Sequence, residues 1–224
     1  MAGVSAGYGQ GYVLHGLDFE ARAGEVALVT GGTGAGKTSF AHLLRLALTP
    51  RGGRALILGA DPANLNGATR ARLKKRIGYV AEDPVFVEHW TAFDNIALPL
   101  KLAGRKVEDY AEDVRALVQY AGLNSAAGEP AWRLSAVERR RTAIARALAS
   151  KPDLLIADAP TSGLAADQAA RVVRLLAELR RVGAAVVITS QDDSIGASVR
   201  AAHWRLELGR LRREDDDESA EAAE

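Results

Sequence analysis

The sequence of 224 residues contains no cysteine, which excludes disulfide bonds, thiolate nucleophiles and cysteine-ligated metal sites. It also lacks any apolar run of the roughly 20 residues that a membrane-spanning helix needs, and its longest runs, such as 184–188, have the length of a strand. The N-terminus does not show the basic and then apolar pattern of a signal peptide. We therefore expect a cytoplasmic protein with one domain of ordinary size.

Acidic residues are sparse in the body of the chain and concentrated at its end. Residues 214–224 carry seven of the 28 acids and no base, so residues 1–213 hold 29 bases against 21 acids. We expect 214–224 to form an acidic, disordered tail. A basic body suits nucleic acid, an anionic membrane surface or nucleotide phosphates. Nucleic acid is disfavoured, because aromatic side chains that could stack on bases are not interleaved with the basic residues.

Short strand-like runs alternate with stretches that have helical spacing of apolar residues. The strand-like runs are 25–30, 55–58, 77–80, 154–157, 185–189 and 204–208, and the helical stretches are 36–47, 107–121, 137–149 and 167–182. This alternation predicts an α/β domain with a largely parallel sheet. The first residues are short of strand signals and rich in glycine, so no clear strand is expected before Tyr8.

A glycine-rich loop follows the first predicted strand and opens a helix. Its residues read Gly-Gly-Thr-Gly-Ala-Gly-Lys-Thr and fit the pattern G-x-x-x-x-G-K-[ST] at every position. Such a loop wraps backbone N–H groups around phosphate oxygens, and the helix N-terminus adds its partial positive charge. The sequence therefore predicts a nucleotide site made by Gly31, Gly32, Thr33, Gly34, Ala35, Gly36, Lys37, Thr38 and Ser39.

Asp158 ends a buried-strand pattern and is predicted to be the distant acid of the same site. A carboxylate there can hold Mg²⁺ through water while Thr38 ligates the metal with its hydroxyl. An enzyme that hydrolyses a nucleotide usually carries a second carboxylate directly after this one. Here that position is Ala159.

With these motifs in place, nearly the whole chain resembles the ATP-binding domains of ABC transporters. The resemblance is carried by five ordered segments, namely the phosphate loop, 76–83, 134–148, "ADAPTSGL" at 157–164 and "VVITSQD" at 186–192. It implies a P-loop NTPase fold of the ABC ATPase type, with a mostly parallel sheet core. It also implies an ATP-binding domain over 1–213 that contains a helical signature subdomain at roughly 86–150.

The same resemblance implies ATP and Mg²⁺ as ligands and a homodimer that forms on ATP binding. In this family two copies sandwich two ATP molecules, each between the phosphate loop of one copy and the signature segment of the other. Ser135 is the signature residue expected at the phosphate and at the start of a helix. Tyr8 matches the aromatic residue that stacks on adenine, with Tyr12 as a substitute.

Within the family, the minimal length, the run at 91–100 and the stretch "VGAAVVITSQD" resemble the cell-division protein FtsE. This implies an FtsX-like integral membrane partner and a peripheral place on the inner face of the cell membrane. Lipoprotein-release and macrolide-export ATPases of the same subgroup are the alternative. The aromatic residues Phe86, Trp90 and Phe93 follow the loop where the family docks its membrane partner, but such a cluster belongs to a core just as often.

Several residues that the family uses are replaced in this chain. Ala159 stands where a glutamate polarises the attacking water, and Gln191 stands where a histidine contacts the γ-phosphate. Glu82 replaces a glutamine near Mg²⁺ and joins Thr38 and Asp158 as a predicted metal ligand. The other replacements are Ala165 for an aspartate of the dimer loop, and Ala136 and Val137 for the paired glycines of the signature.

These replacements predict that no catalytic residue is intact at positions 82, 159 and 191. General-base catalysis contributes about 10²–10⁴-fold, so its loss predicts slow hydrolysis. The damaged signature and the damaged catalytic strand lie in one chain. A homodimer would therefore have two faulty sites, and pairing with an intact partner would place one fault in each site. We therefore expect a subunit that binds ATP with weak or no hydrolysis. The alternative is an active ATPase for lipoprotein release or export that uses another residue as base.

Overall fold

A six-stranded sheet forms the centre of the domain in the computed structural model, which describes residues 1–214 apart from the side chains of 182, 197 and 198. Its strands are β3 (Val26–Thr30), β5 (Ile77–Val80), β6 (Leu154–Ala157), β7 (Ala185–Ser190), β8 (Ala202–Glu207) and β9 (Arg210–Arg213). They lie in the order β5-β6-β7-β3-β8-β9, and all neighbours are parallel except β9, which is antiparallel to β8. The predicted α/β class with a mostly parallel sheet is confirmed.

A smaller antiparallel sheet was not expected from the sequence. It consists of β1 (Ala2–Ala6), β2 (Leu14–Leu17) and β4 (Gly52–Arg54), in the order β2-β1-β4. The prediction that no strand precedes Tyr8 is therefore wrong. Val4 and Ala6 of β1 are fully buried, and pairing on both sides supplies the backbone hydrogen bonds that the weak local strand propensity cannot secure alone.

The strand predicted at 55–58 is also wrong. Ile57 makes a single bridge with Ala60 around a tight turn, in which Leu58 and Gly59 have φ angles of 50° and 80°. Two consecutive positive φ angles reverse the chain at once, so no strand can form there. The apolar pattern of this segment instead reflects burial of Ala55 and Ile57 in the core.

The helices agree with most of the predicted stretches. They are α1 (Lys37–Leu44), α2 (Gly67–Lys74), α3 (Ala92–Leu102), α4 (Val107–Tyr120), α5 (Ala136–Leu148) and α6 (Ala166–Ala177), with a 3₁₀ turn at Glu178–Val182. Helices α2 and α3 were not predicted, and α3 contains Pro99, which has no N–H to donate within a helix.

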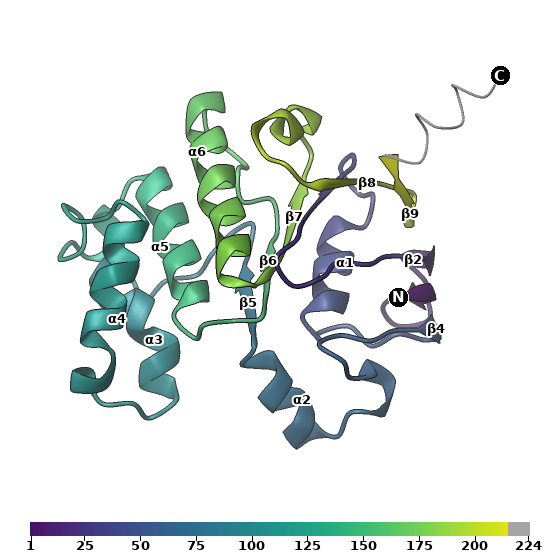
Figure 1. Cartoon of the computed structure of the whole chain (residues 1–224), viewed down its shortest axis with the longest axis horizontal. Coiled ribbons are helices and arrows are strands. Elements are labelled where there is room, and N and C mark those ends of the chain that lie inside the picture. The colour runs from purple at the N-terminus through teal and green to yellow at the C-terminus, as the bar shows by residue number, and fades with distance from the viewer. Residues whose placement is uncertain (215–224) are drawn as a thin grey trace.

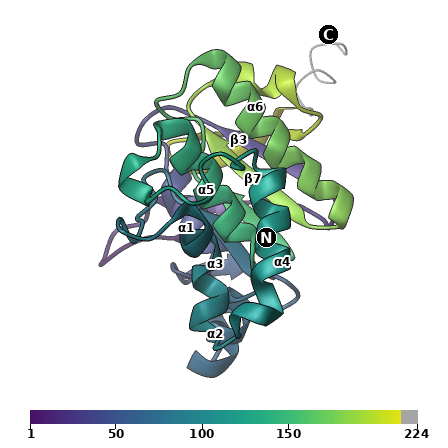
Figure 2. The ribbon, with the colours of Figure 1, turned by 90° about the vertical axis from the view of Figure 1, so that its left-hand side faces the viewer.

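The two faces of the large sheet are covered by different layers. On β3, Val26 and Leu28 pack into the core formed with α3 to α6, whereas Ala27 and Val29 pack into the core formed with α1 and the small sheet. Figure 1 shows α3, α4 and α5 at one end of the molecule, away from the small sheet, and Figure 2 looks at that end. The loops that follow β3, β6 and β7 leave the same edge of the sheet, because these strands are parallel.

Candidate functional site

The glycine-rich loop joins β3 to α1, and its backbone geometry depends on glycine at two positions. A Cβ atom on Gly31 would overlap the carbonyl oxygen of Leu206 in β8, so only glycine lets these strands lie so close. Gly36 has a φ angle of 107° and precedes the first residue of α1. The chain therefore turns sharply into the helix, with the N-terminus of α1 directed at the loop.

A cavity of about 300 Å³ lies over this loop and gathers most of the predicted site residues, although Tyr8 and Ser135 are not among its lining residues. Its lining residues are Val13, Thr33, Gly34, Gly36, Lys37, Thr38, Ser39, Glu82, Asp158, Ala159 and Gln191. Gly31, Gly32 and Ala35 belong to the same loop but do not line the cavity. The structure thus brings together the loop, the three predicted metal ligands and the two replaced catalytic positions.

Lys37 lies folded back onto its own loop. Its Nζ donates to the carbonyl oxygens of Gly31 at 2.6 Å and Gly32 at 2.8 Å. Burial lowers the pKa of the Lys37 ammonium, while the carboxylates of Asp158 and Glu82 act in the opposite direction. The ammonium is therefore a buried positive charge next to acidic neighbours, at the floor of a cavity that can accept an anion.

Asp158 is almost completely buried, and two side chains donate to its carboxylate. The Thr189 hydroxyl donates to Oδ1 at 2.7 Å, and the Tyr79 hydroxyl donates to Oδ2 at 3.4 Å. Burial, and next the Asp158 charge, raise the pKa of Tyr79 to about 12, so its hydroxyl stays protonated at neutral pH. Thr189 and Tyr79 were not predicted as site residues, although Thr189 and Ser190 at the end of the otherwise apolar strand β7 were a visible signal.

The donor set of the cavity fits Mg²⁺. Thr38, Glu82 and Asp158 offer one hydroxyl and two carboxylates to the same cavity, and Mg²⁺ prefers oxygen ligands. Within residues 1–214, no group of three or more His, Cys, Asp or Glu side chains is arranged to hold a metal by itself. A metal here would complete its shell with water and phosphate oxygens, as Mg²⁺ commonly does.

The replaced catalytic positions also have defined neighbours. The Thr33 hydroxyl of the phosphate loop donates to Gln191 Oε1 at 3.2 Å. Ala159 is buried with a φ angle of 43°, and its N–H donates to Thr189 Oγ1 at 3.0 Å. Its methyl group lies at the cavity wall and can neither accept a proton nor orient water.

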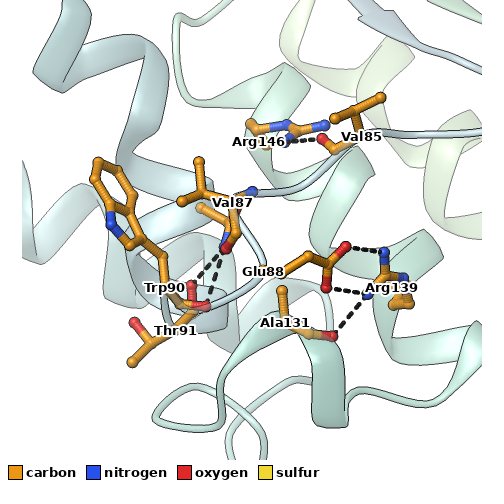
Figure 3. A network of polar contacts seen from close by, with 9 residues as sticks. Val85, Val87, Glu88, Trp90, Thr91, Ala131, Arg139 and Arg146 are labelled. Carbon is orange, nitrogen blue, oxygen red and sulfur yellow. Dashed lines mark hydrogen bonds and ion pairs between the residues drawn. The ribbon is translucent and has the colours of Figure 1, made fainter.

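Three arginines of α5 hold the loop that contains Glu82. Arg140 is buried and donates to the carbonyl oxygens of Ala81 at 3.0 Å and Glu82 at 2.8 Å. Arg139 pairs with Glu88 at 2.8 Å, and Arg146 donates to the carbonyl oxygen of Val85 at 2.8 Å, as Figure 3 shows. The loop that contains Glu82 and the predicted signature helix are therefore tied together.

Two of the three aromatic residues after Glu82 belong to the core. Phe86 is buried, and the guanidinium groups of Arg139 and Arg146 lie 4.6 and 4.8 Å from its ring centre. Phe93 packs against the core as a partly buried residue, whereas Trp90 is exposed. A docking surface made of all three rings is therefore not present.

Ser135 and Tyr8 lie outside the phosphate cavity of their own chain. Ser135 is the N-cap of α5, as predicted for a helix start, and its hydroxyl donates to Glu138 Oε2 at 2.7 Å. Hydrogen bonds from Ser135 lower the pKa of Glu138, so this carboxylate is ionised and holds the cap. Tyr8 is half exposed, and its hydroxyl lies 3.0 Å from His42 Nδ1.

A groove of about 650 Å³ lies beside the helical end of the molecule, between α3, β5 and the end of α5. Its lining includes the apolar residues Leu98, Leu102 and Ala103, and Leu102 is 80% exposed. Its lining also includes the basic residues Lys74, Lys75, Arg105, Arg146 and Lys151. Among residues 1–214, no helix is both long and apolar enough to cross a bilayer.

Comparison with solved structures identifies the fold. The dimeric post-hydrolysis state of the ATP-binding cassette MJ0796 bound to ADP and Pi matches with a TM-score of 0.85 at 24% identity. The match covers 95% of this chain and 96% of that one. The predicted P-loop NTPase fold of the ABC ATPase type is confirmed.

Sequence comparison assigns the family. The family profile described as "ABC transporter" matches residues 14–162. Lipoprotein-releasing system ATP-binding protein LolD 1 of Caulobacter vibrioides is 37% identical over 191 residues, which are 83% of this chain and 80% of that protein. The LolD protein of Anaeromyxobacter dehalogenans is 37% identical over 186 residues, or 82% and 78% of the two chains. The chain belongs to the ABC transporter family.

Proposed function

We propose that this chain is the ATP-binding subunit of a membrane complex of the lipoprotein-release or export type, and that it binds Mg-ATP with weak hydrolysis. The observation that carries the proposal is the single cavity that joins Lys37 and Thr38 to Asp158 and Glu82. Positive charge and N–H groups suit the phosphates, and the oxygen donors suit the metal. Ala159 lies at the same cavity and supplies no base.

The roles within the site follow from this geometry. The ammonium of Lys37 would exchange the carbonyl oxygens of Gly31 and Gly32 for phosphate oxygens. Thr38, Glu82 and Asp158 would hold the metal, and Tyr8 would stack on the adenine. Ser135 would complete the site of a second copy in an ATP-bound homodimer, because it lies outside the cavity of its own chain.

The cargo and partner are proposed from the relatives. Both LolD proteins carry a lipoprotein-releasing name, which favours the release or export alternative over an FtsE-like role with an FtsX-like partner. An integral membrane protein would hold the chain at the inner face of the cell membrane. Its cytoplasmic segment would enter the groove at Leu98 and Leu102, where apolar and basic side chains line the same groove and Leu102 is exposed.

Millimolar Mg-ATP is expected to raise the melting temperature of the protein. A ligand at 100 times its Kd stabilises the folded state by about 2.7 kcal/mol, which corresponds to about 5–10 °C for a chain of this size. Lys37→Ala is expected to abolish this shift, because it removes the buried ammonium at the cavity floor. Differential scanning calorimetry measures both proteins. An equal shift in the variant, or no shift in the wild type, contradicts the proposed nucleotide site.

Leu102→Glu is expected to release the protein from membranes of its native host without changing its melting temperature. The side chain is 80% exposed in the groove, so a carboxylate there costs little in the free protein but opposes an apolar contact with the partner. Leu208→Glu is the matched control, since Leu208 is 90% exposed on the turn after β8. Sedimentation of tagged variants with membranes gives the readout. Full retention of Leu102→Glu contradicts docking in the groove.

A further inference from the structure

We propose that Thr189 is a positioning residue that orients Asp158 for Mg²⁺, with Tyr79 as a second donor on the other carboxylate oxygen. This inference rests on the proposed function, since it assumes that the cavity takes a metal with its nucleotide. Thr189 is the next-to-last residue of β7, and Asp158 directly follows the last residue of the neighbouring strand β6.

The Thr189 hydroxyl uses both its donor and its acceptor capacity at this point. It donates to Asp158 Oδ1 at 2.7 Å and accepts from the N–H of Ala159 at 3.0 Å. The side chain is completely buried, so water cannot replace either bond. One hydroxyl therefore fixes the carboxylate and the peptide that follows it.

A second buried threonine, Thr142, provides a comparison for Thr189. Thr142 in α5 is also completely buried, but its Oγ1 has no hydrogen-bond partner among the described residues. The hydroxyl of Thr189, in contrast, is bound on both sides. Burial alone therefore does not give a threonine a hydrogen-bonding role, and Thr189 has such a role because both of its bonds are made.

Tyr79 restrains the other oxygen of Asp158. Its hydroxyl lies 3.4 Å from Oδ2, and the guanidinium of Arg45 lies 4.3 Å from the centre of its ring. The long contact makes this the weaker of the two restraints. With one protein donor on each oxygen, Asp158 has a fixed orientation and still has lone pairs for a metal or its water.

Thr189 is also connected to other residues of the site through the backbone. Thr189 precedes Gln191 by two residues, and Gln191 accepts from Thr33 of the phosphate loop. Ala159, bound to Thr189 through its N–H, has the left-handed φ angle of 43° that turns the chain away from β6. A change at Thr189 therefore acts on the metal ligand first and on the phosphate loop only indirectly.

The test compares nucleotide affinity with and without the metal. Calorimetric titrations of ATP in excess Mg²⁺ and in EDTA give two dissociation constants for each protein. Thr189→Val keeps the shape and removes the hydroxyl, and it is expected to weaken binding about 10–100-fold in Mg²⁺ while leaving binding in EDTA unchanged. Thr189→Ser is expected to restore most of the loss. Thr142→Val is the matched control and is expected to bind as the wild type does.

The outcomes separate the two levels of the argument. Wild-type protein that does not bind ATP, or binds it equally in Mg²⁺ and EDTA, overturns the proposed function. Wild-type protein with metal-dependent binding and an unaffected Thr189→Val variant overturns the role of Thr189 alone. Equal losses in Mg²⁺ and EDTA assign Thr189 to general stability and also overturn it. If Thr189→Val does not fold, Tyr79→Phe is the second variant. A smaller loss of ATP affinity that occurs only in Mg²⁺ supports the need for donors that orient Asp158, and an unchanged affinity contradicts it.

Discussion

Phosphate release by Ala159→Glu is expected to exceed that of the wild type by about 10²-fold, the lower end of what a general base contributes. Ala159 lies at the cavity wall, one residue after Asp158, so a carboxylate on its Cβ would enter the cavity beside the proposed phosphates. The φ angle of 43° is borne equally by alanine and glutamate, since both have an unbranched Cβ. Steady-state release of inorganic phosphate measures the rate.

The gain is expected to be partial, because other replaced residues still weaken the closed state. Adding Gln191→His with Ala136→Gly and Val137→Gly is expected to raise the rate more than additively, since the closed geometry must form before a base can act. Ala159→Gln is the matched control, with the same size and no base. Rapid turnover by the wild type contradicts the slow-hydrolysis proposal. A combined variant as slow as the wild type would show that the defect lies elsewhere, and Glu82 would be the next position to change.

Asn95→Ala is expected to lower the free energy of unfolding by about 3 kcal/mol. Asn95 of α3 is completely buried, and its Oδ1 accepts from the N–H of Val87 at 3.0 Å. Its Nδ2 lies within hydrogen-bond distance of three carbonyl oxygens, those of Val87, Trp90 and Thr91. Alanine leaves the N–H of Val87 without its acceptor and removes the side-chain donor from the three carbonyl oxygens, which keep their backbone donors. It also opens a cavity, and these effects favour unfolding.

Urea denaturation measures this loss, and the melting temperature is expected to fall by about 6–12 °C. Asn95→Asp is expected to be at least as damaging, because it places a carboxylate against the same three carbonyl oxygens. Asp167→Asn on the exposed start of α6 is the control for a change of the same kind at the surface. A loss below about 1 kcal/mol for Asn95→Ala would show that the loop at 87–91 is held by other contacts.

The parts of the candidate site that could be predicted from the sequence are those that depend on short local patterns. The phosphate loop needs a fixed spacing and a strand before it, and Asp158 ends a buried strand, so both could be read directly. The contact of Thr189 with Asp158 could not, because it depends on two strands 31 residues apart lying side by side. The same limit explains why the packing of Phe86 against two arginines of α5 was not predicted.

Errors in the predicted fold have related causes. Strand β1 has weak local signals and exists through pairing with β2 and β4. The segment 55–58 has the apolar residues of a strand, but two positive φ angles turn it into a reversal. In both cases tertiary packing, rather than local propensity, selects the conformation.

The position of β3 in the large sheet determines when the site can form during synthesis. β3 carries the phosphate loop and lies between β7 and β8, which belong to the last part of the described chain. Gly31 packs against Leu206 of β8, so the loop lacks one of its walls until that strand has left the ribosome. The proposed nucleotide site is therefore completed only after β8 has been synthesised.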